Sequence, residues 1–474
     1  MLNYDVKSGN ASEFICDFEI KKTIDYATTY RNDKALIESI LAKAAEGKGL
    51  NHREALVLLE CDDKEVEDRV FSLAREIKHR IYGNRIVMFA PLYLSNYCVN
   101  GCVYCPYHAK NKTIARRKLT QEEIRREVIA LQDMGHKRLA LETGEHPKQN
   151  PIEYILESIN TIYSIHHKNG AIRRVNINIA ATTIENYRRL RDAGIGTYIL
   201  FQETYCRRIY EKLHPTGPKS DWSYHTEAMD RAMSGGIDDV GIGVLFGLND
   251  YRYDFVGLLM HSEHLEASFG VGPHTISVPR IRSAEGINPL DFPHAVTDEM
   301  FRRIVAVLRI AVPYTGMIVS TRESKECREL VLDVGVSQLS GASRTSVGGY
   351  SEINDAAKNS SQFDISDDRT LDEVVAWLLG LGYVPSFCTA CYREGRTGDR
   401  FMTLAKSGKI GDCCAPNALM TLQEYLEDYA SDCTRDLARQ VISNELQSIT
   451  SDRVREIARS RLIDIINGKR DFRF

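Results

Sequence analysis

The sequence has no long apolar segment and no strong excess of charge. No run of 18 or more apolar residues occurs in its 474 residues, which excludes a typical transmembrane helix. The first residues lack the basic start and the apolar stretch of a signal peptide. The net charge of -4 gives no electrostatic reason to expect nucleic acid or an anionic membrane as a partner. We therefore expect a cytoplasmic protein with no nucleic-acid and no membrane partner.

A dinucleotide-binding motif is also missing, and this bears on the fold. No G-x-G-x-x-G opens a helix after the first β-prone segment, which argues against an open dinucleotide-binding sheet. Eight β-prone segments alternate with helical patterns, at 85–94, 137–142, 173–180, 196–202, 239–247, 274–279, 316–321 and 334–340. This alternation predicts an α/β protein with a (β/α)8 barrel at 81–345, preceded by a helical extension at 1–80. A mostly helical C-terminal domain, which contains several of the cysteines, is predicted at 346–474.

Cysteine, by contrast, is abundant: the chain has twelve, which in a reducing compartment are more often thiolates than disulfides. Cys98, Cys102 and Cys105 follow the first β-prone segment, and the turn-forming residues among them favour a loop over a helix. Three thiolates converging from a loop suit an iron–sulfur cube with one open iron, which can bind the amino and carboxylate groups of a methionine. A zinc site is the alternative, but it more often uses four ligands.

The spacing C-x3-C-x2-C, with an aromatic residue before the last cysteine, resembles the signature of the radical S-adenosylmethionine (SAM) superfamily. The resemblance implies a 4Fe-4S cluster on this first cysteine triad and SAM as a second cofactor. Taken singly, each further matching position could equally be a strand-end packing or turn residue. The implied SAM contacts are Tyr104 to the adenine, Thr143, Gly144 and Glu145 to the amino group, Gln202 and Glu203 to the ribose, Arg231 to the carboxylate and Gly243 beside the adenine.

A second cysteine group lies in the C-terminal part of the chain. Cys388 and Cys391 are followed, after 22 residues, by Cys414, which has Cys413 beside it. A zinc site using all four thiols is one interpretation, but adjacent cysteines rarely both bind one small ion. A second iron–sulfur cluster is favoured, because the cell already loads such a cluster into the first site of the same chain.

This C-x2-C-x22-C pattern, added to a radical SAM barrel, resembles the family of tyrosine lyases that mature FeFe-hydrogenase. The resemblance runs through nearly the whole chain and includes SNYCVNGCVYC, RVNINIAATT, GVGPHTISVPR and CTACYREGRTGDRFM. Pro106 and the extra thiol of Cys413 depart from the family pattern, and only Cys414 gives the family spacing. The barrel alone also resembles 2-iminoacetate synthase of thiamine biosynthesis, which cleaves the same substrate. A non-enzymatic iron–sulfur scaffold is a third interpretation, and the SAM-site residues argue against it.

The resemblance implies a specific chemistry. The first cluster reduces SAM, and the resulting radical takes hydrogen from the amino group of L-tyrosine. Cleavage of the Cα–Cβ bond gives p-cresol and dehydroglycine, and dehydroglycine yields carbon monoxide and cyanide for an iron unit held at the second cluster. The implied partners are L-tyrosine, cysteine as an iron ligand, other hydrogenase maturation proteins and an electron donor.

The same resemblance implies that the second cluster carries an additional labile iron with a histidine ligand. The candidates are His261, His264 and His274. The first two lie at i and i+3 of a predicted helix and are expected to face solvent. His274 begins the sixth β-prone segment, on the barrel face opposite the SAM site, and is the preferred ligand. The alternative for His274 is a hydrogen-bonded loop histidine.

Arg322 and Ser320 stand at the end of the seventh β-prone segment. A planar guanidinium matches the geometry of a carboxylate. Arg322, helped by Ser320, is therefore predicted to hold the tyrosine carboxylate. The alternative is a salt bridge from Arg322 to Glu323 or to a neighbouring loop.

Overall fold

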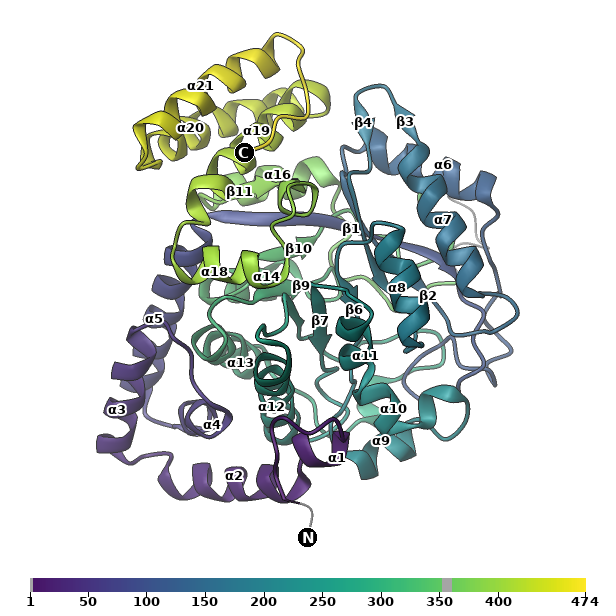
Figure 1. The fold of residues 1–474 in the computed structure, drawn as a ribbon, viewed down its shortest axis with the longest axis vertical. Helices are drawn as coiled ribbons and strands as arrows, with labels where there is room; N and C mark the ends of the chain where they lie inside the picture. Colours follow the sequence, from purple (N-terminus) through teal and green to yellow (C-terminus); the bar gives the residue numbers. More distant parts are fainter. Residues whose placement is uncertain (1–2, 352–359) are drawn as a thin grey trace.

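The structure is a computed structural model that describes residues 3–351 and 360–474. Within these residues, parallel strands close into an eight-stranded barrel, shown in Figure 1. The barrel strands are β1 (Arg85–Ser95), β2 (Arg138–Thr143), β5 (Arg174–Asn178), β6 (Tyr198–Ile199), β7 (Val240–Gly243), β8 (Thr275–Ser277), β9 (Gly316–Val319) and β10 (Gln338–Ser340). The predicted (β/α)8 barrel is confirmed, and each β-prone segment overlaps one barrel strand.

Strand β1 both closes the barrel and extends it. It pairs with β10 through residues 87–89 and with β2 through residues 90–95. Its first residues, 85–87, also pair with β11 (Val384–Ser386), a strand from the C-terminal part of the chain. Because Val87 pairs with β10 and β11 at once, β11 lies on the side of β1 that β2 occupies further along. The sequence analysis missed β11 because three residues are too few to show a period.

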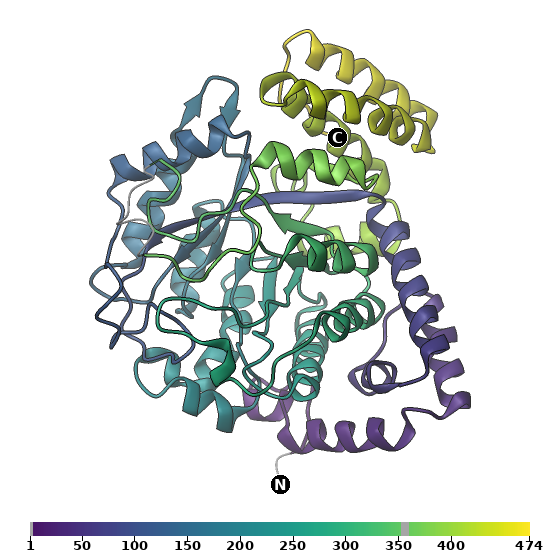
Figure 2. The same cartoon turned by 180° about the vertical axis from the view of Figure 1, so that it is seen from behind.

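Helices cover the outside of the barrel, as Figures 1 and 2 show from opposite sides. They are α6 (Gln121–Asp133), α7 (Ile152–Ser164), α8 (Ile184–Asp192), α9 (Arg207–Leu213), α10 (Trp222–Thr226), α11 (Ala228–Ser234), α12 (Tyr251–Phe269), α13 (Asp298–Ala311) and α14 (Lys325–Val334). A small hairpin of β3 (His166–His167) and β4 (Gly170–Ala171) follows α7. Alternate residues of β1, among them Ile86, Met88 and Leu92, are fully buried and form part of the core. No described helix is long and apolar enough to span a membrane.

The chain before the barrel is helical, as predicted, and packs on barrel helices α12 and α13. Its helices are α1 (Ala11–Phe14), α2 (Asp17–Tyr30), α3 (Lys34–Ala45), α4 (His52–Glu60) and α5 (Lys64–Tyr82). The prediction that His261 and His264 face solvent is wrong, since they are only 2% and 1% exposed. The ring of Phe14 stacks on His264 with centroids 3.8 Å apart, and Tyr205 bonds His261 at 2.9 Å. The N-terminal helices cover the face of α12 that carries the polar side chains of His261 and His264.

The C-terminal part adds helices beside β11 (Figure 1). They are α16 (Leu371–Gly380), α17 (Ala390–Arg393), α18 (Gly398–Lys406), α19 (Gly411–Asp428), α20 (Asp432–Ser448) and α21 (Asp452–Ile466). One carboxylate of α19, Glu424, lies 3.2 Å from Lys137 Nζ and 2.9 Å from Arg173 Nη1. Lys137 and Arg173 precede β2 and β5, so this buried group fixes α19 to the amino-terminal ends of the barrel strands.

We expect Glu424→Gln to lower the stability of the folded chain by about 3–5 kcal/mol, because it leaves Lys137 buried without its counter-charge. Denaturant unfolding followed by circular dichroism measures the change. The matched control is Glu427→Gln on the same helix, where the carboxylate is exposed and accepts a bond from Gln423. Equal stability losses in the two variants would show that the buried contact does not hold α19 in place.

Candidate active site

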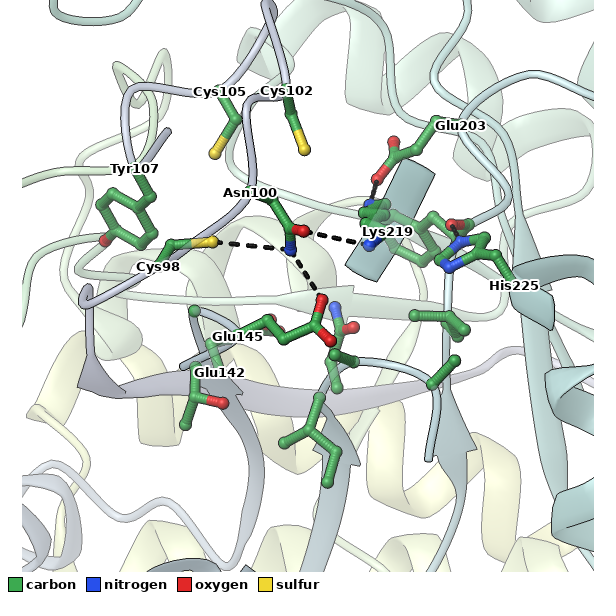
Figure 3. Close-up of a pocket in the computed structure, with 18 of the residues that line it drawn as sticks. Cys98, Asn100, Cys102, Cys105, Tyr107, Glu142, Glu145, Glu203, Lys219 and His225 are labelled. Atoms are coloured by element: carbon green, nitrogen blue, oxygen red, sulfur yellow. Dashed lines mark hydrogen bonds and ion pairs between the residues drawn. The ribbon is translucent and has the colours of Figure 1, made fainter. Parts of the chain in front are cut away.

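A cavity opens at the carboxyl-terminal ends of the barrel strands (Figure 3). Together with the open space at its mouth it measures about 1150 Å³. It is lined by the loop after β1, by the ends of β2 and β5, and by the segments that follow β6 and β9.

The first cysteine triad lines this cavity. Cys98, Cys102 and Cys105 lie in a non-helical loop, as predicted, and the backbone N–H of Val103 anchors it to the carbonyl of Leu213 at 3.0 Å. Burial raises the pKa of Cys102 to about 11 and raises that of Cys105 further. Bare thiolates would be costly there, whereas bonding to iron stabilises the deprotonated sulfur. The donor set therefore suits an iron–sulfur cluster.

The side chain of Asn100 joins three parts of the site (Figure 3). Its Nδ2 donates to Glu145 Oε2 at 2.6 Å and lies 3.7 Å from Cys98 Sγ. Its Oδ1 accepts the backbone N–H of Lys219 at 3.0 Å. This buried amide links the cysteine loop to the end of β2 and to the segment after α9. No sequence pattern points to this role, since an asparagine beside a glycine is an ordinary turn residue.

A buried ion pair lies on the far side of Asn100. Lys219 Nζ is 2.8 Å from Glu203 Oε1, and both residues line the cavity. Burial opposes the charge of Lys219, but the carboxylate of Glu203 outweighs that effect and raises the lysine pKa. Glu203 has a φ of 68°, a left-handed conformation that is uncommon for glutamate and turns its side chain into the cavity. Sequence analysis did not identify Lys219, because a lysine in a loop is most often a solvated charge.

Several residues that the sequence predicted to contact SAM line the cavity together. They are Tyr104, Thr143, Gly144, Glu145 and Glu203. Tyr104 is buried, and its hydroxyl is 2.8 Å from His214 Nε2, which holds the ring beside the last cysteine of the triad.

Gln202, Arg231 and Gly243 lie outside the set of described residues that line the cavity. Gln202 donates to the Thr226 hydroxyl at 2.9 Å, because neighbouring residues of an extended segment face opposite ways. Arg231 donates to the carbonyl of Thr182 at 3.0 Å. At Gly243, a Cβ would lie 2.5 Å from the carbonyl oxygen of Ser277, so close packing explains this glycine.

Arg322 lines the cavity, and its guanidinium lies 3.7 Å from the ring centroid of Phe363. Its Nε is buried with no hydrogen-bond partner among the described residues. The alternative salt bridge to Glu323 is not formed within these residues, because Glu323 pairs with Arg280 and Arg282. Ser320 accepts the backbone N–H of Arg322 at 3.3 Å and lies outside the described lining.

Glu142 lies in the same cavity, at the end of β2 (Figure 3). Burial raises its pKa well above the usual range, against the opposing effects of Arg322 and of a hydrogen bond from Asn178. The cavity therefore combines a cation and a buried carboxyl group. In the sequence, Glu142 begins the strand-end motif Glu142-Thr143-Gly144-Glu145, whose last three residues were assigned to SAM, and no contact with the substrate was predicted for Glu142.

The second cysteine group lies at the opposite, amino-terminal end of the barrel. Cys388 follows β11, and Cys391 and Cys414 belong to one buried apolar cluster. A hydrogen bond from Cys414, with help from the guanidinium of Arg396, lowers the pKa of the Cys391 thiol. Burial opposes the charge of Arg85, but the nearby cysteines together have the larger effect, and the net result is a raised pKa for Arg85. Among the described residues, no group of His, Cys, Asp and Glu side chains is arranged to hold a single metal ion.

His274 precedes β8 at this same end of the barrel. Its Nε2 is 2.9 Å from the hydroxyl of Tyr392, the residue after Cys391, and its Nδ1 is 3.3 Å from Asp239 Oδ1. Its ring centroid lies 4.7 Å from that of Phe401, which packs in the same cluster as Cys391. Burial lowers the pKa of His274 to about 4, so the ring is neutral near pH 7. The structure thus brings His274 near the second cysteine group.

Comparisons with known proteins agree with this architecture. Residues 92–259 match the model of the radical SAM superfamily, and residues 277–384 match the Biotin and Thiamin Synthesis associated domain. A crystal structure of HydG, a maturase of the FeFe-hydrogenase, is 52% identical with a TM-score of 0.93 and covers 97% of this chain and 100% of that chain. HydG from Carboxydothermus hydrogenoformans is 38% identical with a TM-score of 0.81, covering 95% and 99%. The 2-iminoacetate synthase of Salmonella typhimurium is 29% identical over 345 residues, which is 72% of this chain and 88% of that protein.

We expect replacement of Cys98, Cys102 and Cys105 by alanine to abolish SAM cleavage and to leave the spectrum of a second cluster. The two thiol sites lie at opposite ends of the barrel strands, so each site uses its own ligands. Iron content, electron paramagnetic resonance and 5′-deoxyadenosine formation measure the effect. Cys433→Ala, an exposed thiol, is the control. Continued 5′-deoxyadenosine formation would contradict the assignment of the first site.

Proposed function

Because the chain belongs to the HydG family of radical SAM maturases, we propose that it is a carbon–carbon lyase acting on L-tyrosine. The products are p-cresol and dehydroglycine, and dehydroglycine yields carbon monoxide and cyanide for an iron precursor of the FeFe-hydrogenase active site. The observation that carries this proposal is the likeness to HydG, which extends over 97% of the chain. The likeness to 2-iminoacetate synthase extends over 72%.

The cavity at the first cysteine triad suits a 4Fe-4S cluster and SAM together. When bound, these cofactors supply a carbon-centred radical that removes a hydrogen atom from the substrate. Thr143, Gly144 and Glu145 would hold the amino end of SAM. Lys219 suits the SAM carboxylate better than Arg231 does, because Lys219 presents its charge to the cavity whereas Arg231 donates to a backbone carbonyl outside it.

The pair of Arg322 and Glu142 suits the two charged groups of an amino acid. The guanidinium of Arg322, whose Nε has no partner among the described residues, would hold the tyrosine carboxylate. In the empty cavity burial raises the pKa of Glu142 and favours its neutral form. The substrate ammonium group would favour the carboxylate instead, so Glu142 would release a proton to solvent and accept a charge-assisted hydrogen bond from the substrate nitrogen.

The second cysteine triad and His274 would hold the second cluster and its additional labile iron. To bind iron, His274 has to exchange its contact with either Tyr392 or Asp239 for the metal. Cysteine as an iron ligand, an electron donor and other hydrogenase maturation proteins complete the proposed set of partners. A 2-iminoacetate synthase is the second candidate, favoured by the shared barrel, and it performs the same cleavage without using the second triad.

Reconstituted protein given SAM, dithionite and tyrosine should form p-cresol. Arg322→Lys and Glu142→Gln should each raise the KM for tyrosine about ten- to a hundredfold and leave the KM for SAM unchanged, because a charge-assisted contact contributes roughly 1.5–3 kcal/mol. Arg188→Lys, on the exposed face of α8, is the control. A raised KM for SAM with an unchanged KM for tyrosine would show that these two groups serve the cofactor.

The two candidate lyases are separated by changing Cys388 and Cys391 to serine. Serine is a poor ligand for soft metals, so the second cluster should be lost. The tyrosine cavity contains neither thiol, so p-cresol should still form. Infrared spectroscopy during turnover should show no iron-bound CO or cyanide, whereas the neighbouring control Cys413→Ser should retain those bands. Bands that persist in the double variant would identify the chain as a tyrosine lyase whose second triad has no part in assembling the iron unit.

A further inference from the structure

Two arginines stand side by side in the interior of the barrel. Arg138 begins β2, Arg174 begins β5, and the two are register partners in neighbouring parallel strands. They are only 8% and 2% exposed. The interior of such a barrel normally holds branched apolar side chains, and like charges directly opposite each other destabilise a sheet. Two adjacent buried guanidinium groups therefore need a compensating anion.

Arg138 does not find that anion among its hydrogen-bond partners. Its Nη1 lies 3.5 Å from Gln338 Oε1, and its Nη2 donates to the carbonyl of Cys388 at 3.2 Å. Its Nε is buried with no partner among the described residues. Burial lowers the pKa of Arg138 to about 10, despite the nearby cysteines.

Arg174 is in the same situation and is more deeply buried. Its Nε donates to Asn176 Oδ1 and its Nη2 to the Thr197 hydroxyl, both at 2.7 Å. Both acceptors are neutral, and Nη1 has no partner within the described residues. Burial and the charge of Arg138 lower the pKa of Arg174 well below its usual range. The guanidinium lies over the ring of Tyr392, in the segment that carries the second cysteine group.

One carboxylate, that of Asp239, acts on the charge of both arginines. Its Oδ1 accepts the backbone N–H of Gly398 at 3.1 Å and lies 3.3 Å from Nδ1 of His274, and its Oδ2 is buried with no hydrogen-bond partner among the described residues. A single carboxylate carries one negative charge and does not balance two guanidinium groups. The contacts of Arg138 with Cys388 and of Arg174 with Tyr392 place the unsatisfied donors next to the second thiol site.

We propose that Arg138 and Arg174 form a binding site for the carboxylate of a small α-amino or α-imino acid beside the second thiol site. The site rests on the proposed function, which delivers two ligands of this chemistry there: the two-carbon dehydroglycine and free cysteine. Paired guanidinium groups offer planar N–H donors that match the two oxygens of a carboxylate. The bound carboxylate would supply negative charge to the unpaired donors, and the contact of Arg138 with Cys388 would place the rest of the ligand beside the second triad.

The experiment uses full-length protein in which Cys98, Cys102 and Cys105 are alanine, so that only the second cluster is present. Glycine, L-cysteine and cysteamine are titrated by calorimetry and by the electron paramagnetic resonance of that cluster. Glycine represents the two-carbon ligand, and cysteamine is cysteine without its carboxylate. We expect Arg174→Met to weaken the binding of glycine and of L-cysteine about ten- to a hundredfold. The affinity for cysteamine should stay unchanged. Weakening of L-cysteine alone would assign the site to free cysteine, and weakening of both would extend it to the two-carbon ligand.

Stability measurements separate binding from a structural role. Without ligand, Arg174→Met removes the repulsion between the two buried guanidinium groups, so its unfolding midpoint should not fall below that of the parent protein. Arg174→Lys, which keeps the charge without the planar fork, should bind glycine with intermediate affinity. Arg453→Met, on an exposed helix face, is the matched control. Unchanged glycine and L-cysteine affinities in Arg174→Met would overturn the proposal. The titrations contain no tyrosine, so they test this site independently of p-cresol formation. Failure to form p-cresol in the separate activity assay would contradict the proposed function alone.

Discussion

The pairing of β1 with three other strands sets the positions of both thiol sites. Residues 87–89 close the barrel against β10, residues 90–95 bond to β2, and residues 85–87 bond to β11. The loop with the first cysteine triad leaves one end of β1, and β11 holds Cys388 near the other end. One strand therefore contacts the segments that carry both sites, and the two sites lie at opposite ends of one barrel.

Buried charged groups have two different functions at the ends of the barrel. Where cation and anion are both present, as at Lys137 and Glu424, the contact fixes one part of the chain to another. Where the donors exceed the acceptors, as at Arg322 and Arg174, the described residues leave buried N–H groups unpaired. A buried charge without a partner is energetically costly, and a bound ligand of opposite charge removes part of that cost. The cavity at the first triad and the arginine pair near the second both show this pattern.

Much of the architecture follows from sequence patterns alone. Eight β-prone segments and the helices between them predicted the barrel, and the spacing of the cysteines grouped them into two triads. Tyr104, Glu145 and Arg322, which the sequence places at strand or loop ends, line one cavity, and their predicted contacts with SAM and tyrosine stay predictions. Asn100 and Lys219 could not be found in this way, because their roles depend on contacts between segments far apart in the chain.

The sequence by itself determined the barrel, the two thiol triads and their assignment to opposite ends, because local periodicity and ligand spacing are properties of short segments. Only the tertiary structure decided which polar residues meet. It turned Gln202 away from the cavity that Glu203 enters, and it buried His261 and His264 beneath the N-terminal helices. The physical reason is that exposure and pairing are set by neighbours brought together by folding, and a short sequence window does not contain those neighbours.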